Sequence, residues 1–219
     1  MQGIQAIFLI LAMGLLVAGP ARAETYQAGR DYEVLPFPQD VNSGNKVEVR
    51  EFFWYGCPHC YAFEPYLDAW LKHKPANVDF IRTPAVTPRW RLHAITFYAL
   101  RELKVGARLH QPLFDALHED EKKAPGERKL FDQDGLADWV AAHGVNRKKY
   151  LEATRSFGVQ FSVNQAKQLF NDYNLDGVPN IIVDGRYRTS PTLVHDEARV
   201  MKVVNYLVHK AAAERSKRK

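Results

Sequence analysis

The sequence predicts an α/β fold in which an all-helical segment interrupts one sheet. Strand, helix and strand patterns follow one another over residues 46–83, helical patterns fill residues 88–175, and strand patterns then return before a last helix. A single sheet built from both ends of a chain requires the helical middle to be an insertion. We expect residues 24–85 and 162–219 to form the α/β part and residues 86–161 to form an inserted helical domain.

The first α/β unit begins at residues 46–55, which are rich in β-branched and aromatic side chains and partly alternate. Gly56 ends this strand, and Pro58 stands at a helix start, where a missing N–H group is tolerated. The helix is expected to continue to His73, and residues 78–83 read as the second strand. Two strands joined through a helix at this spacing are parallel, with a right-handed crossover.

The middle of the chain carries apolar residues at helical spacing in five stretches. These residues are Leu92, Ile95, Ala99, Leu100 and Leu103; Leu109, Leu113, Phe114 and Leu117; Leu136, Val140 and Ala141; Tyr150, Leu151 and Ala153; and Val163, Ala166, Leu169, Phe170 and Tyr173. We interpret them as core packing. The charged stretch 119–129, with Pro125-Gly126 inside it, is predicted to be a surface loop.

The end of the chain predicts a β-hairpin followed by a helix. Residues 178–183 and 186–189 read as strands, and Asp184-Gly185 between them is a favoured hairpin turn. An amphipathic helix is expected from about His195 to Ala213.

The N-terminus has the pattern of a secretory signal, residues 1–23. Residues 4–18 are almost wholly apolar, and Ala21-Arg22-Ala23 places small residues before a cleavage point. The apolar run is short for a transmembrane helix, but no Lys or Arg precedes it, so an uncleaved anchor is the alternative. The formal net charge is +5, much of it from the tail 215–219. We interpret that tail as a solvated terminus and expect no nucleic-acid partner.

The four-residue run Cys57-Pro58-His59-Cys60 holds both cysteines of the chain. A disulfide across it closes a very short loop and removes little entropy from the unfolded chain, so it is a poor structural staple. Two cysteines in an exported chain therefore indicate a disulfide that is made and broken. Half of a zinc site, or a soft copper(I) site, is the alternative.

The position of each cysteine at the strand–helix junction predicts its role. Cys57 stands at a helix N-terminus, where the N–H groups of His59 and Cys60 and the helix dipole favour a thiolate. Cys60 lies one turn further on, so it is more buried and close enough to resolve a mixed disulfide. The His59 imidazole further stabilises the Cys57 thiolate, which makes the disulfide more oxidising.

Two acidic residues lie near this motif. Glu51 shares the strand parity of Val49 and Phe53, which predicts a carboxyl among apolar neighbours with a raised pKa. Such a group can exchange the proton of Cys60; the alternative is a different register with Glu51 exposed. Glu64 could join the same pocket, although an ordinary surface ion pair on the helix is the favoured interpretation.

Gly177-Val178-Pro179 opens the late strand with a proline, a residue confined to strand edges and special bonds. A cis bond at Val178–Pro179 would be one such case. Base rates alone do not support it, because few X-Pro bonds are cis in folded proteins.

Together these residues resemble the DsbA family of periplasmic thiol:disulfide oxidoreductases over nearly the whole chain after residue 23. The resemblance rests on four stretches of the sequence. They are Glu51-Phe52-Phe53 on the strand before the motif, the motif at 57–60, Gly177-Val178-Pro179, and Asp184-Gly185-Arg186-Tyr187 in the following hairpin. It implies a thioredoxin fold interrupted by the helical domain. It also implies that Val178–Pro179 is cis and lies against the disulfide, that the Val178 backbone pairs with an extended substrate, and that Glu51 is a buried acid.

The resemblance further implies that the Cys57–Cys60 disulfide passes to reduced, unfolded secreted proteins in the periplasm. A DsbB-like quinone-linked membrane protein would reoxidise the pair, and neither a metal nor another cofactor is expected. The chain is expected to be a monomer. The alternatives are a disulfide reductase or isomerase, and a metal-binding module on the same fold. Trp54, Tyr55, Tyr61 and Phe63 flank the motif either as a peptide platform or as core residues.

Overall fold

A computed structural model describes residues 25–217 of the chain. The predicted signal, residues 1–23, lies outside the described residues. Among the described residues, none of the helices combines the length and the apolar character needed to cross a membrane.

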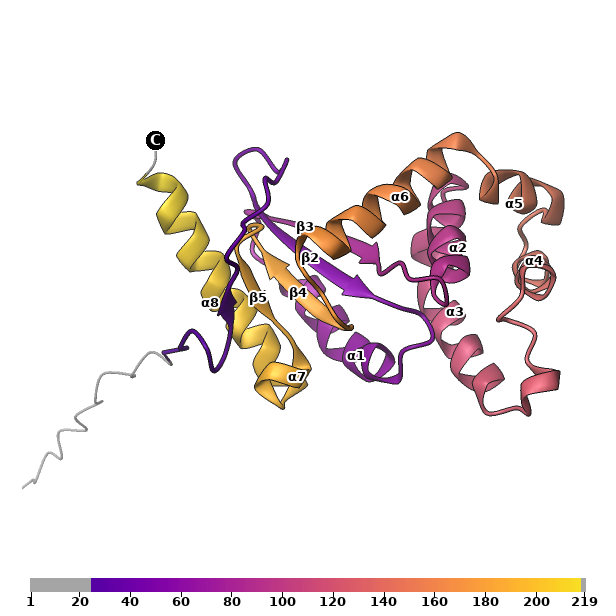
Figure 1. Cartoon of the computed structure of the whole chain (residues 1–219), viewed down its shortest axis with the longest axis horizontal. Helices are drawn as coiled ribbons and strands as arrows, with labels where there is room; N and C mark the ends of the chain where they lie inside the picture. The colour runs from indigo at the N-terminus through magenta and orange to yellow at the C-terminus, as the bar shows by residue number, and fades with distance from the viewer. Residues whose placement is uncertain (1–24, 218–219) are drawn as a thin grey trace, which may run out of the picture.

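One sheet of five strands forms the α/β part (Figure 1). Its strands are β1 (Glu33–Val34), β2 (Val47–Phe53), β3 (Val78–Pro84), β4 (Asn180–Val183) and β5 (Tyr187–Thr189). They lie in the order β1-β5-β4-β2-β3, with β2 and β3 parallel and the other neighbours antiparallel. The predicted parallel pair, the hairpin and their union in one sheet are therefore confirmed. The sequence pattern missed β1, which is only two residues long.

Helices account for most of the rest of the described chain. They are α1 (Pro58–His73), α2 (Arg91–Glu102), α3 (Gly106–Glu121), the short 3-10 helix η1 (Pro125–Glu127), α4 (Gln133–Ala142), α5 (Arg147–Thr154), α6 (Phe157–Asp172), α7 (Pro191–Val194) and α8 (Glu197–Ser216). Helices α2 to α6 form a block beside the sheet, and α6 leads back from it towards the strands (Figure 1). Because α6 runs through residues 161 and 162, the division of the chain between those residues stays a prediction.

Both faces of the central strand β2 are covered. Val47 and Val49 pack with α1 and α8, whereas Phe52 on the opposite face contacts Phe170 and Tyr173 at 6.0 and 5.7 Å between ring centroids. This double burial explains why residues 47–53 show so little alternation, as strands covered on both faces do.

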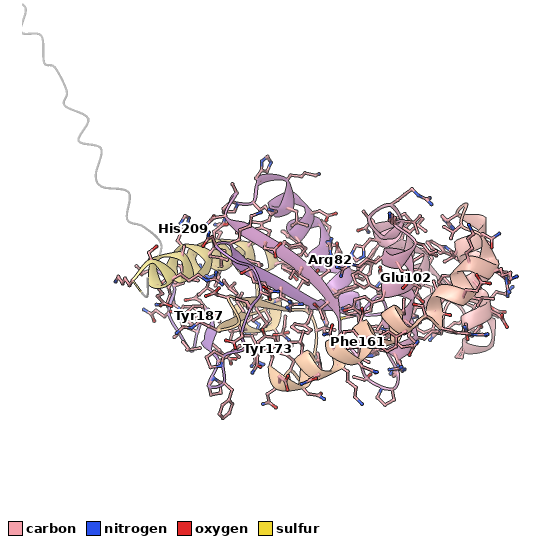
Figure 2. All side chains as sticks on the ribbon, turned by 90° about the horizontal axis from the view of Figure 1, so that it is seen from above. Arg82, Glu102, Phe161, Tyr173, Tyr187 and His209 are labelled. Atoms are coloured by element: carbon pink, nitrogen blue, oxygen red, sulfur yellow. The ribbon has the colours of Figure 1, made fainter. Side chains whose placement is uncertain are left out.

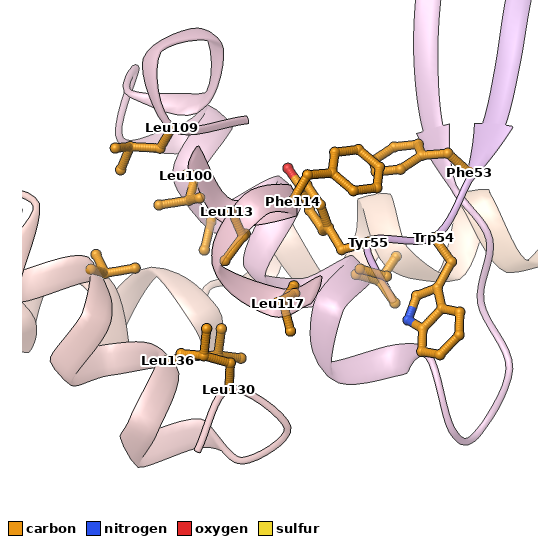
Figure 3. Close-up of a cluster of buried hydrophobic side chains, with 14 of the residues drawn as sticks. Phe53, Trp54, Tyr55, Leu100, Leu109, Leu113, Phe114, Leu117, Leu130 and Leu136 are labelled. Carbon is orange, nitrogen blue, oxygen red and sulfur yellow. The ribbon is translucent and has the colours of Figure 1, made fainter. Parts of the chain in front are cut away.

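A third core joins the helical block to the end of β2 (Figure 3). Phe53, Trp54 and Tyr55 pack there with buried leucines of α2, α3 and α4, and Cys57 and Cys60 belong to the same cluster. The chain that leads into the cysteine motif is therefore anchored in the insertion.

Two local predictions within the helical block are wrong. Helix α3 continues to Glu121, and Asp120, expected in a surface loop, is buried with 2% exposure. Its carboxylate accepts hydrogen bonds from the backbone N–H groups of Lys129 and Leu130 at 2.8 and 2.7 Å, which fixes the loop against the helix. Ala141 is exposed, and Ala137 takes the buried position one turn earlier.

Candidate active site

The motif occupies the start of α1, at the carboxyl end of β2. Cys57 is the N-cap residue, and its sulfur accepts a hydrogen bond from the backbone N–H of Cys60 at 3.4 Å. Pro58 fills the first helical position, where its missing N–H leaves nothing unpaired. Both cysteines are free thiols here, with exposures of 7% for Cys57 and 0% for Cys60. The structure thus places Cys57, which keeps slight exposure, above the fully buried Cys60.

The Cys57 thiol has a pKa lowered to about 6. The largest cause is a hydrogen bond donated by the Cys60 thiol, and burial opposes it. The backbone N–H groups of Cys60 and His59 and the charge of the His59 imidazole lower the pKa further. The sequence predicted the N–H groups and the imidazole but missed the Cys60 thiol, because its effect depends on a distance between side chains.

Cys60 shifts in the opposite direction. Burial raises its pKa well above the usual value, and the hydrogen bond to Cys57 and the negative charges of Cys57 and Glu51 add to the rise. At neutral pH the pair therefore holds a thiolate at Cys57 and a proton at Cys60.

The side chain of His59 is exposed at the tip of the helix, as is that of Pro58. On the other side of Cys57, the bond Val178–Pro179 is cis, as the family resemblance implies. The Cys57 sulfur lies 3.5 Å from the carbonyl oxygen of Val178, to which its protonated form donates a hydrogen bond. Residues 121 positions apart in the chain thus meet at the nucleophilic sulfur.

Below the motif lies a buried group of charged side chains. Glu51 on β2 is fully buried, so the exposed alternative is excluded. Arg82, its neighbour on β3, donates from Nε to Glu51 at 3.1 Å and from Nη2 to Glu64 at 2.7 Å. Glu64 on α1 is 1% exposed, so the favoured surface ion pair was wrong and the shared pocket is correct. Burial, and then the charge of Glu64, raises the pKa of Glu51 to about 8 against the effect of Arg82.

Two further members of this group went unrecognised in the sequence, Arg82 and His110. Figure 2 shows Arg82 at the end of the strands that faces the helical block. His110 on α3 is buried, with Nδ1 2.9 Å from the Tyr55 hydroxyl and Nε2 3.6 Å from Glu64. The only available signal for His110 was its place beside Leu109 and Leu113 on the apolar face of a helix, which equally suits a core histidine.

The four aromatic residues that flank the motif divide by exposure. Trp54, Tyr55 and Phe63 are buried, whereas Tyr61 is 36% exposed. The Trp54 indole N–H donates to Nδ1 of His93 at 2.9 Å, so this residue ties the active-site loop to α2.

A sequence model described as "DSBA-like thioredoxin domain" matches residues 82–208. The thiol:disulfide interchange protein DsbA of Burkholderia cepacia is 40% identical over 200 residues, covering 90% of each chain. The DsbA of Pseudomonas aeruginosa is 36% identical over 209 residues, covering 95% of this chain and 96% of that protein.

Solved structures agree with these sequence relatives. The crystal structure of Pseudomonas aeruginosa DsbA matches with a TM-score of 0.79 at 36% identity, over 87% of this chain and 97% of that one. The oxidoreductase DsbA of Xylella fastidiosa matches with a TM-score of 0.77 at 29% identity, over 86% of this chain and 98% of that one. The chain therefore belongs to the DsbA family and is a thiol:disulfide oxidoreductase with a thioredoxin fold.

Proposed function

We propose that the oxidised Cys57–Cys60 pair donates its disulfide to reduced proteins newly exported to the periplasm. The observation that carries this direction is the opposite shift of the two thiols, with the pKa of Cys57 near 6 and that of Cys60 well raised. A stabilised thiolate favours the reduced form of the pair, and a disulfide whose reduced form is stabilised is a stronger oxidant. DsbA is the standard example of this relation between a stabilised thiolate and oxidising power.

The reaction follows from the placement of the two sulfurs. A substrate thiolate attacks the accessible Cys57 sulfur, the bond between the cysteines breaks, and its electron pair passes to Cys60. The second thiolate of the same substrate then attacks the substrate sulfur that is bonded to Cys57. Cys57 leaves as a thiolate. The substrate loses two electrons and two thiol protons, and the protein gains both electrons. One proton ends on Cys60, and the other goes to solvent because Cys57 stays ionised.

Glu51 is proposed to supply the proton that Cys60 takes up. Its carboxyl is fully buried, its charge contributes to the raised pKa of Cys60, and its own raised pKa lets it hold a proton near neutrality. His59 is proposed to stabilise the Cys57 thiolate from the exposed side, and Pro58 to start the helix that carries both sulfurs.

Val178 and Pro179 are proposed to form the substrate-binding edge. The Val178 carbonyl lies beside the Cys57 sulfur, and an extended peptide paired with this backbone would present its cysteine to Cys57. The family relationship supports reoxidation by a DsbB-like quinone-linked membrane protein and export by a cleaved signal at residues 1–23. The proposal needs no metal and no cofactor beyond the disulfide. The described residues contain no group of three or more His, Cys, Asp or Glu side chains arranged to hold a metal.

The roles of the two cysteines and of Glu51 can be tested in one assay. Cys57→Ser should abolish oxidation of a reduced dithiol peptide. Cys60→Ser, first activated at Cys57 as a mixed disulfide with a small thiol, should exchange with a peptide that carries a single cysteine and accumulate the Cys57–peptide mixed disulfide. Glu51→Gln should lower the rate of exchange through Cys60 by about tenfold or more, with an unchanged Cys57 pKa. Glu33→Gln serves as the control, because it changes a half-buried carboxylate on the edge strand β1, at the opposite edge of the sheet from β3. Activity in Cys57→Ser, or a normal rate in Glu51→Gln, would contradict the assigned role.

A further inference from the structure

In the described part of the chain, three buried polar atoms of the group around Arg82 make no hydrogen bond. They are Glu51 Oε1, Glu64 Oε1 and His110 Nε2. Buried polar atoms without protein partners in native proteins are normally bonded to ordered water. Because all three side chains belong to the group around Arg82, they mark one polar spot under the active site.

The ring of His110 is oriented by the groups at its two nitrogens. Burial raises the pKa of Tyr55, so its hydroxyl keeps its proton and can donate it to Nδ1 of His110 at 2.9 Å. In the neutral imidazole the ring proton then sits on Nε2, which faces Glu64 Oε1 at 3.6 Å. That separation is just longer than a hydrogen bond, so a small movement of either side chain closes it.

His110 also lines a cavity of about 480 Å³ at the junction between β3 and the helical block. The lining includes the apolar side chains of Phe80 and Phe97, and the charged side chains of Arg82 and Arg101. Neither Glu51 nor Glu64 lines this cavity. Of the residues that line it, Arg82 and His110 contact the buried carboxylates, and only His110 has a neutral form at neutral pH.

We propose that His110 is the proton-exchange residue of this enzyme, which passes protons between the cavity and the buried carboxylate pair Glu51 and Glu64. This inference rests on the proposed role of Glu51. His110 does not touch the sulfurs and acts only through Glu64, so it is a positioning residue for the proton rather than a group that takes part in sulfur chemistry.

The proton balance of the step is simple. When a substrate thiolate breaks the disulfide, Cys60 leaves with the electron pair and takes a proton from Glu51. Glu51 is reprotonated through the Glu51–Glu64 pair. The His110 ring takes a proton from cavity water at Nδ1, in place of its hydrogen bond with Tyr55, and as an imidazolium gives its Nε2 proton to Glu64. No electron passes through His110, and one solvent proton enters for each disulfide that is reduced.

The charges around His110 suit a group that carries a proton only in passing. Burial and the charge of Arg82 lower its pKa, whereas Glu64 and the more distant Asp68 oppose this effect. Glu51 pairs with Arg82 from β2, the Tyr55 hydroxyl lies at the other ring nitrogen, and Asp79 and Arg101 stand in the cavity wall. The ring is therefore neutral at rest and is charged only while a proton is transferred.

The test is the rate at which a dithiol peptide reduces the oxidised pair, measured by stopped flow from pH 5 to 9. His110→Gln should lower the rate by about tenfold and change the shape of its pH profile. A proton relay speeds both directions equally, so the reduction potential and the Cys57 thiolate titration should not change. In His110→Ala, added imidazole should restore the rate, with a pH dependence that follows free imidazole.

His118→Gln is the matched control, because His118 lies on the same helix but stacks on Tyr61 at 4.4 Å and faces Glu121. Its pH profile should match that of the unmodified protein. A normal rate and profile in His110→Gln would overturn the proposal, as would a rate loss in His110→Ala that imidazole leaves unchanged. If Glu51→Gln slows the reaction and His110→Gln does not, only the relay fails; if neither slows it, the role of Glu51 fails as well. His110→Gln keeps polar groups in the pocket and decides the question if His110→Ala does not fold.

Discussion

At the scale of single residues, position rather than residue type separates the two cysteines. Cys57 and Cys60 are three residues apart, yet the pKa of one falls to about 6 and that of the other rises well above 9. The first caps a helix at the protein surface, and the second lies one turn deeper, where burial disfavours any charge. The same hydrogen bond between them lowers one pKa and raises the other, so each thiol reinforces the role of its partner.

His59 gives a direct test of this electrostatic account. His59→Leu removes the charge that contributes to the low pKa of Cys57, so that pKa should rise and the pair should become less oxidising. While the Cys57 pKa stays below the pH, each unit of rise corresponds to about 30 mV. The potential can be measured by equilibration with a redox buffer. His73→Leu, at the exposed far end of the same helix, should leave the potential unchanged, and an equal effect of both changes would refute the account.

At the scale of elements, the junction between β2 and α1 determines where Cys57 stands. The Trp54 indole stacks on Trp90 with ring centroids 5.1 Å apart and folds back over Gly56. A Cβ atom on Gly56 would lie 2.5–2.9 Å from atoms of the indole, closer than such atoms can approach. Because His93 and Trp90 hold the ring, it cannot move aside freely.

Gly56→Ala should therefore destabilise the protein and displace the start of α1. We expect a loss of about 1–3 kcal/mol in the free energy of unfolding, measured by denaturant titration, together with a raised pKa of Cys57. Gly126→Ala is the control, since a Cβ there meets nothing within 4 Å. A stable Gly56→Ala variant with an unchanged Cys57 pKa would show that the indole does not fix the junction.

At the scale of the whole molecule, the helical insertion and the sheet are joined through buried polar contacts as well as apolar packing. His93 on α2 accepts the Trp54 N–H at Nδ1 and donates from Nε2 to the Leu130 carbonyl at 3.0 Å. The contact with Trp54 needs a neutral ring, and burial lowers the pKa of His93 to about 4 against the opposing effect of the Leu130 carbonyl. Protonation would place a hydrogen on Nδ1 against the indole N–H.

This contact makes the stability of the protein depend on pH. The unfolded histidine binds a proton below about pH 6.5, whereas the folded one binds it only near pH 4, so stability rises with pH between these values. Acidification from pH 6.5 to 4 should cost about 3 kcal/mol through this group. His93→Gln offers an acceptor and a donor without titrating, so it should flatten the pH dependence in that window. Parallel stability curves for the two proteins would contradict this assignment.

The sequence allowed the order of strands and helices, the helical insertion, the deeper burial of Cys60 and the buried Glu51 to be predicted, because these follow from local pattern and parity. It did not allow Arg82, His110 and His93 to be assigned. Their functions depend on which side chains meet across the sheet and the insertion, and nothing local to residues 82, 93 or 110 encodes those meetings. Glu64 was misjudged for the same reason, since helical spacing alone does not show which face is covered by Arg82.

The most direct test of the account is the redox equilibrium of Cys57–Cys60 with glutathione at pH 7, read by thiol trapping. We expect the pair to be largely reduced even when oxidised glutathione is in excess, because the stabilised Cys57 thiolate favours the reduced form. A pair that stays oxidised in an excess of reduced glutathione would behave as a reductase and would contradict the proposal that this protein donates disulfides.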